Sequence, residues 1–442
     1  MARATKRGSV IRRWVSKLVT VEDGEWRATL LAFTFFFFLL ASYFILRSIR
    51  DALGVQAGVG TLPYLFTGTL LSTLALQPIS ASLVARIPVR RFIPIVYRAF
   101  GACLLFFGAA LTWWPHSDKW LAPVFFIWTS VFNLFVVSVF WGFISDSFTV
   151  EQSKRLYGFI SVGGTIGAIA GSAITALLAK KLGTAPLVLI SAIMLEITVQ
   201  CVRKFPSSFR SDTRAREDAK RPVGGGSLSG ITHVMSSPYL MMICLFMLLF
   251  TIGTTLLYFQ QAVIVKAEFH DRNSQTAFLA KIDLTVQILT FFAQVFLTGR
   301  IIKWLGVGIT LAILPVMSII GFTAMGVWPV LAVFVAFNVI RRAGNYGFSS
   351  PGREVLFTVV SAEDKYKAKN FIDTFVYRTG DQIGAWTSAY LASAGLGVLA
   401  ISWLAAPMSA IWLFVALWLG RRHAKMQAAE TPELAAPRVA MA

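Results

Sequence analysis

The feature of this chain that most constrains its fold is a succession of apolar runs, each about 20 residues long, separated by short charged loops. A helix needs about 20 mostly apolar residues to cross the hydrocarbon core of a bilayer. Of the 442 residues, 56% are hydrophobic and only 14% are charged, whereas soluble chains have about 25% charged residues. The sequence therefore predicts an all-α integral membrane protein.

Twelve runs are long enough to span a membrane. They lie near 28–52, 62–85, 92–114, 121–146, 157–179, 184–202, 238–264, 276–299, 306–326, 328–349, 370–393 and 397–419. Lys and Arg gather in alternate loops, as the positive-inside rule requires of cytoplasmic loops. We therefore expect a multi-pass protein of a bacterial-type cytoplasmic (inner) membrane, with both termini in the cytoplasm. The formal charge of +20 belongs largely to these loops and does not indicate a nucleic-acid partner.

The longest hydrophilic stretch divides the chain into two similar halves. We expect a basic cytoplasmic N-tail at 1–26, a six-helix bundle at 27–202, a cytoplasmic linker at 203–232, a second six-helix bundle at 233–420 and a cytoplasmic C-tail at 421–442. The basic loop after the second span is echoed after the eighth, and the charged loop after the fourth span is echoed after the tenth. A parallel repeat of six plus six spans is the organisation of major-facilitator transporters.

Charged residues inside the predicted spans point to function, because each costs roughly 2.5–3.5 kcal/mol at the bilayer centre and normally faces a cavity or a partner. The tenth span has the most polar face. Its polar residues recur at helical spacing and therefore share one side of the helix; they are Asn338, Arg341, Arg342, Asn345 and Tyr346. We interpret this stripe as an anion-binding wall. The alternative is a structural arginine pair satisfied by carbonyls or by acids on neighbouring helices.

Further intramembrane charges are candidates for substrate binding. They are Arg47, Arg50 and Asp51 in the first span, Lys281 and Asp283 in the eighth, and Arg378 and Asp381 in the eleventh. For the charges of the first span, the alternative to substrate binding is a position at the membrane interface. With Asp373 included, six cations stand against four acids on these spans and the tenth. This excess favours an anionic solute, which Arg341 and Arg342, with Arg47 or Arg50, would clamp.

Charged clusters in the predicted cytoplasmic loops are candidates for a gate. We expect ion pairs that close the cytoplasmic entrance to involve Arg90, Arg91, Asp146, Glu151, Lys154, Arg155, Glu363, Lys365 and Lys367, with Lys369 at the end of this run. In the fifth span, Gly163, Gly167 and Gly171 make two successive GxxxG spacings, which predict close helix packing.

The sequence offers no equipment for catalysis. It contains no G-x-x-x-x-G-K-[ST] loop, no H-E-x-x-H and no G-x-S-x-G motif. The three cysteines lie singly in apolar runs, which indicates reduced packing residues rather than metal ligands. We therefore expect no enzyme activity, no metal and no cofactor.

Two segments resemble the ATP:ADP antiporter family of intracellular bacteria and plastids, which is related to major-facilitator transporters. One runs from Phe140-Trp141-Gly142-Phe143 through Asp146 to Lys154-Arg155-Leu156-Tyr157-Gly158. The other is an ordered set of residues, namely Arg353-Glu354, Glu363, Lys365, Lys367, Lys369, Ile372-Asp373, Arg378 and Gly380. The first span, with Tyr43 to Arg47 and Arg50-Asp51, is also similar. The resemblance implies nucleotide exchange, with the positions of Arg50 and Asp146 contributing to the site.

The chain departs from the family at Asp381, where those proteins carry a lysine after the Arg378-x-Gly380 pattern. An acid there would weaken a polyphosphate site, so the substrate class stays open between a nucleotide, another organic phosphate and a carboxylate. The first alternative is a proton-coupled symporter or exporter in which Asp381 or Asp51 titrates. A membrane scaffold that transports nothing is a second alternative. The partners we expect are the lipid bilayer and a small anionic solute, with a nucleotide or a proton as candidate co-substrate, and we expect a monomer.

Overall fold

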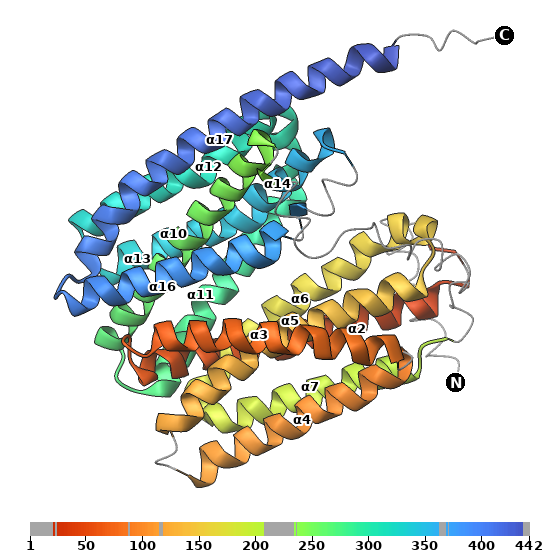
Figure 1. Cartoon of the computed structure of the whole chain (residues 1–442). Helices are drawn as coiled ribbons and strands as arrows, with labels where there is room; N and C mark the ends of the chain where they lie inside the picture. Colours follow the sequence, from red (N-terminus) through yellow and green to blue (C-terminus); the bar gives the residue numbers. More distant parts are fainter. Residues whose placement is uncertain are drawn as a thin grey trace. The chain divides into compact units, whose positions relative to one another are not determined.

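The computed structural model describes residues 21–22, 24–86, 89–114, 118–206, 234–235, 237–361, 368–369 and 371–435. Every regular element in these ranges is a helix (Figure 1). Eight of the described helices are long and apolar enough to cross a membrane: Trp26–Ala57, Arg91–Trp113, Lys119–Ser147, Glu151–Leu182, Thr184–Arg203, Pro238–Glu268, Arg272–Val327 and Val398–Ala429. The expected class, an all-α chain with many apolar helices, is confirmed.

The chain divides into two compact units. Unit 1 comprises Met1–Ala57, Gly68–Arg221 and Phe269–Leu284, and unit 2 comprises Gly58–Thr67, Pro222–Glu268 and Thr285–Ala442. Each unit therefore consists mainly of one half of the sequence. The segments 58–67 and 269–284 are the exceptions, because each packs with the unit formed mainly by the other half.

Unit 1 is built around its first helix. Its helices are α2 (Trp26–Ala57), most of α3 (Leu62–Arg86), α4 (Val89–Trp113), α5 (Asp118–Ser147), α6 (Val150–Leu182), α7 (Thr184–Arg203) and the first part of α11 (Arg272–Phe292). The central helix α2 packs against α5, α6 and α7, and α4 packs against α7. Helix α6 begins at a capping box of Thr149 and Gln152 and ends at Gly183, whose φ of 80° is one that glycine adopts readily.

Helices α2 and α6 approach closely along a stripe of glycines. A Cβ atom at Gly167 would overlap the backbone of Phe37. The glycines one turn to either side, Gly163 and Gly171, face the backbone carbonyls of Phe33 and Ala41 in the same way. The prediction that these glycines pack helices together is confirmed.

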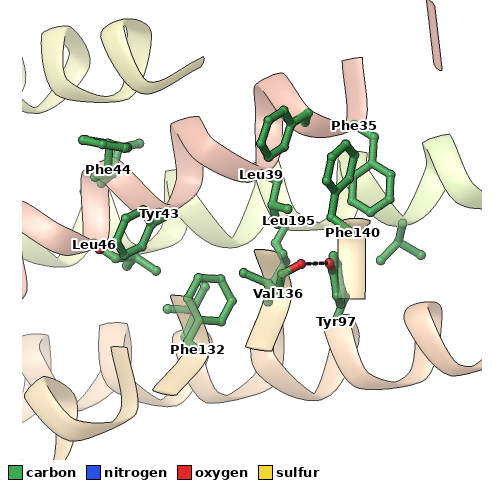
Figure 2. Packing of buried hydrophobic residues seen from close by; sticks show 14 of the residues in the cluster. Phe35, Leu39, Tyr43, Phe44, Leu46, Tyr97, Phe132, Val136, Phe140 and Leu195 are labelled. Atoms are coloured by element: carbon green, nitrogen blue, oxygen red, sulfur yellow. Dashed lines mark hydrogen bonds between the residues drawn. The ribbon is translucent and has the colours of Figure 1, made fainter. Parts of the chain in front are cut away.

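Aromatic side chains fill the interior of unit 1. Phe35 of α2 meets Phe140 of α5 edge to face, with ring centroids 4.9 Å apart. Figure 2 shows Tyr97 of α4 in this cluster, where its hydroxyl donates a hydrogen bond of 2.9 Å to the carbonyl oxygen of Val136. The donor of a fully buried tyrosine is thus satisfied by backbone, and α4 is tied to α5.

Unit 2 has the same kind of helices with more interruptions. Its helices are α10 (Pro238–Glu268), the end of α11, α12 (Thr298–Val327), α13 (Leu331–Gly344), α14 (Ser350–Leu356), α16 (Tyr377–Ser393) and α17 (Val398–Ala435). Short π-helices join them at η1 (Ala293–Leu297), η2 (Asn345–Ser349) and η4 (Ile372–Val376), and η3 (Phe357–Val359) is a 3-10 helix. Gly306, with φ of 73°, breaks the long run that contains α12.

Glycine contacts recur in unit 2. Gly380 and Gly384 of α16 lie against Thr251 and Thr255 of α10, with no room for a side chain. Helices α12 and α17 likewise meet at Gly308 and Gly420. Each unit therefore joins its first long helix to a later helix through small residues, α2 with α6 and α10 with α16.

Candidate functional site

The arginines of α2 lie in the second half of that helix and are paired with acids inside unit 1. Arg47 Nε is 3.7 Å from Asp283 Oδ2 of α11, and their side chains are 18% and 3% exposed. If the hydrocarbon core is centred on α2, Arg47 lies within about 10 Å of one edge of it. The pair thus connects α2 to α11 through a half-buried arginine and a buried aspartate.

Arg50 and Asp51 form a second ion pair on the same helix. Arg50 Nη2 and Nε lie 2.7 Å and 2.9 Å from Asp51 Oδ1. The Arg50 guanidinium also donates to the hydroxyl of Ser130, at 3.4 Å, and lies over the ring of Phe126. Because both charges are buried or half-buried, this is a compact, hydrogen-bonded charge pair rather than a solvated surface pair.

The polar stripe of α13 is buried in unit 2. Arg341 is 2% exposed and donates to Ser318 Oγ at 3.0 Å, to Thr254 Oγ1 at 3.1 Å and to the Phe250 carbonyl at 3.4 Å. Asn338 donates to Gln261 Oε1 at 2.9 Å. Arg342, next in the chain, is half-buried. Two hydroxyls and one backbone carbonyl hold Arg341, and of these only the carbonyl is a partner that the structural alternative named.

The α-helical spacing behind the stripe ends at Gly344. Asn345 and Tyr346 belong to the π-helix η2, whose turn is wider than an α-helical turn. Asn345 is half-buried, and its Oδ1 has no hydrogen-bond partner among the described residues, whereas Tyr346 is 39% exposed. The strict α-helical period assumed for all five residues therefore needs correction after Arg342.

Asp381 lies between α16 and α10. It is 8% exposed, accepts a hydrogen bond of 3.1 Å from the Thr255 hydroxyl and pairs with Arg378 Nη1 at 3.3 Å. The side chain of Arg378 is 24% exposed. Half-buried Arg378 and buried Asp381 thus form an ion pair that is fixed to the neighbouring helix, whereas Asp373 of the same predicted span is exposed.

The predicted gate residues are placed differently from one another. Arg155 Nη2 lies 3.0 Å from Glu22 and 3.0 Å from Glu25, which precede α2 in the same unit. Glu151, Lys154 and Arg91 are exposed, and Asp146 is half-buried. Lys281, a substrate-binding candidate rather than a gate residue, is also exposed. The side chain of Arg90 lies outside the described part of the structure, as do Glu363, Lys365 and Lys367.

Sequence reasoning missed several of the groups that hold these charges, among them Glu25, Thr255 and Ser318. Glu25 is 3% exposed and also accepts a hydrogen bond of 2.9 Å from Gln152. Thr255 and Ser318 bind Asp381 and Arg341. Threonine and serine are common in membrane helices, so no signal in the sequence distinguished these hydroxyls from ordinary packing residues.

Comparison with known proteins gives a family and a fold. The model of the TLC ATP/ADP transporter family matches residues 105–423. The ADP,ATP carrier protein 1 of Chlamydia trachomatis is 23% identical over 362 residues, which cover 72% of this chain and 68% of that protein. The chloroplastic ADP,ATP carrier protein 2 of Arabidopsis thaliana is 22% identical over 423 residues, covering 80% of this chain and 67% of that protein.

Solved transporter structures share the fold at low sequence identity. A bacterial homologue of the lysosomal transporter Spinster superposes with a TM-score of 0.59 at 16% identity, covering 92% of this chain and 98% of that one. A D-xylose-proton symporter gives a TM-score of 0.61 at 13% identity, covering 89% and 97%. These neighbours confirm a major-facilitator-like fold. The family model matches well over half of this chain, and the relatives are named as ADP,ATP carriers. The chain therefore belongs to the TLC ATP/ADP transporter family, and it is a membrane transporter rather than an enzyme.

Proposed function

We propose that the protein exchanges an anionic solute, a nucleotide or a related organic phosphate or carboxylate, by alternating access across a bacterial cytoplasmic membrane. The single observation that carries this proposal is the family match, because the relatives are named as ADP,ATP carriers. Three arginines support an anionic substrate, namely Arg47, Arg341 and Arg378. They lie on membrane-spanning helices, where a cation costs free energy and usually serves substrate binding or an ion pair.

The substrate site we propose comprises the charges already described. In unit 1 these are Arg47, Arg50, Asp51, Lys281 and Asp283, and in unit 2 they are Asn338, Arg341, Arg342, Asn345, Arg378 and Asp381. Guanidinium forks bind carboxylates and phosphates in bidentate geometry, which suits this composition. Three of these arginines pair with aspartates of their own unit. An incoming anion would compete with those aspartates for the same guanidinium groups.

The architecture we propose is twelve spans in two six-helix bundles with cytoplasmic termini. Gly306 supports it, because it divides the 56-residue run Arg272–Val327 into two lengths that each suffice for a span. The cytoplasmic gate we propose comprises the charged loop residues expected from the sequence, namely Arg90, Arg91, Asp146, Glu151, Lys154, Arg155, Glu363, Lys365 and Lys367. The pairing of Arg155 with Glu22 and Glu25 adds the N-terminal segment to that network.

Transport by the purified protein tests this proposal. Proteoliposomes loaded with ADP should take up labelled ATP, ADP or another anion from a panel, and unloaded proteoliposomes should not. Replacing Arg341 and Arg342 together by Gln should abolish uptake with the protein still present in the membrane. Arg421→Gln with Arg422→Gln, on exposed residues of α17, is the matched control and should leave uptake unchanged. Full uptake by the Arg341 and Arg342 variant would exclude this substrate site.

A proton-coupled mechanism is the second candidate, and the buried position of Asp381 favours it. Asp381 is held by Arg378 and Thr255 within unit 2. A proton on Asp381 would remove its negative charge and so weaken its attraction to Arg378. Under this candidate, uptake into unloaded proteoliposomes should follow an imposed proton gradient and collapse with a protonophore. Asp381→Asn should then uncouple uptake from the gradient. Exchange that ignores a protonophore would exclude proton coupling.

A further inference from the structure

Helices α4 and α7 lie side by side in unit 1 (Figure 1). An ion pair joins them on an exposed face. Arg98 Nη2 lies 2.8 Å from Glu196 Oε1, and Arg98 Nε lies 3.1 Å from Oε2. Gln200 also donates a hydrogen bond to Oε1. The two charged side chains are 49% and 45% exposed, so they face away from the interior of the unit.

These charges lie at a depth where lipid would be expected. The candidate span Arg91–Trp113 has 23 residues and Thr184–Arg203 has 20, which correspond to about 34 Å and 30 Å of helix. Either length matches the roughly 30 Å hydrocarbon core. Ile95 and Ile193, one helical turn from the charged pair, are 62% and 63% exposed. The charged pair is therefore flanked on both sides by exposed apolar side chains.

The antiparallel packing of α4 and α7 brings two further cations to the same level. Arg91 lies seven residues before Arg98, and Arg203 lies seven residues after Glu196. Seven residues are two helical turns, or about 10 Å, on either helix. Because Arg98 and Glu196 are in contact, Arg91 and Arg203 end up level with each other on the same outer face, at the ends of both spans.

Arg91 and Arg203 are both exposed, and neither makes a hydrogen bond or an ion pair with another described residue. Arg98 donates a hydrogen bond to each carboxylate oxygen of Glu196, and Arg203 also interacts electrostatically with this carboxylate, so the negative charge is largely neutralised. The surface thus presents two cations at the edge of the hydrocarbon core, above an internally paired charge and an apolar strip.

We propose that this α4–α7 face binds the headgroup of an anionic phospholipid, with its phosphate between Arg91 and Arg203 and its acyl chains along Ile95 and Ile193. Charge complementarity selects this ligand, because basic pockets between membrane helices attract anionic headgroups. A second copy related by a twofold axis fits less well, since it would bring like-charged arginines together. The proposal does not depend on which solute is transported.

Lipid-dependent stability of the full-length protein tests the site. Thermal unfolding in detergent is measured with added phosphatidylglycerol, phosphatidylcholine or inorganic phosphate. Phosphatidylglycerol should raise the unfolding temperature of the wild type, and the other two should not. In Arg91→Gln with Arg203→Gln, the apparent affinity for phosphatidylglycerol should fall about fivefold for each cation removed. Arg421→Gln with Arg422→Gln is the control of equal charge change and should respond like the wild type.

Two further measurements keep the test decisive if the double Gln variant folds poorly. Arg91→Lys with Arg203→Lys keeps both charges and should keep most of the stabilisation. Native mass spectrometry of the wild type in an equimolar mixture of the two lipids should retain phosphatidylglycerol preferentially. Equal retention of both lipids, or an unchanged response in the Gln variant, would overturn the proposal. So would a wild-type dimer that the Gln variant converts to monomer, because the face would then be a contact between copies.

Discussion

Arg341 is a cation held in an apolar interior by neutral groups. Its partners among the described residues are two hydroxyls and one carbonyl, and no carboxylate pairs with it there. The hydroxyls of Thr254 and Ser318 also donate to carbonyls of their own helices. Removing the guanidinium would therefore leave no unsatisfied hydroxyl donor, while it would remove a buried charge. This arrangement is expensive for stability, which is the reason to connect it with function.

Arg341→Met should leave the fold intact and abolish transport. Replacing a buried charge by an apolar side chain of similar length is often stabilising, so we expect a gain of about 2 kcal/mol. Thermal unfolding of the purified variant and uptake into proteoliposomes are the measurements. Arg342→Met, at the half-buried neighbour, is the control and should change stability little. A marked loss of stability in Arg341→Met would instead assign Arg341 a structural role.

At the scale of elements, the contact between α2 and α6 depends on the absence of side chains. Gly167 faces the backbone of Phe37, whereas an added Cβ at Gly158 on the same helix would meet nothing within 4 Å. The two glycines therefore have opposite roles in one helix. Gly167 permits close approach, and Gly158 only lowers helix propensity.

Alanine at these two positions should have opposite effects on stability. Gly167→Ala forces α2 and α6 apart and should cost about 1–3 kcal/mol. Gly158→Ala adds a favourable helical residue at an open position and should gain up to about 1 kcal/mol. Thermal unfolding of both variants under the same conditions decides the matter. If both changes were equally tolerated, the close contact of these helices would not contribute to stability.

At the scale of the whole molecule, the proposed even number of spans places both termini on one side of the membrane. Epitope tags at either end should be inaccessible to antibody in spheroplasts, from which the outer membrane has been removed, and accessible after permeabilisation. A tag after Gly60, in the exposed turn between α2 and α3, is the control and should be accessible in intact spheroplasts. An accessible tag at either terminus in intact spheroplasts would contradict the proposed orientation, which rests on the distribution of Lys and Arg.

The sequence alone predicted the helical membrane class, the resemblance to the ATP:ADP antiporters and the packing role of Gly163, Gly167 and Gly171. These properties follow from local patterns, because hydropathy and residue spacing along one helix determine whether it can span lipid and which face it packs. The same patterns identified Arg47, Asp283, Arg341 and Asp381 as unusual charges at membrane depth.

Only the tertiary structure decided which groups these charges meet. Asp283 pairs with Arg47 from another helix, Arg341 is surrounded by hydroxyls, and Asp381 is fixed by Thr255. The π-helix that begins at Asn345 and the pairing of Arg98 with Glu196 could not be predicted either. Contacts of this kind depend on how neighbouring helices are rotated and shifted along their axes, and the periodicity of a single helix contains no information about either.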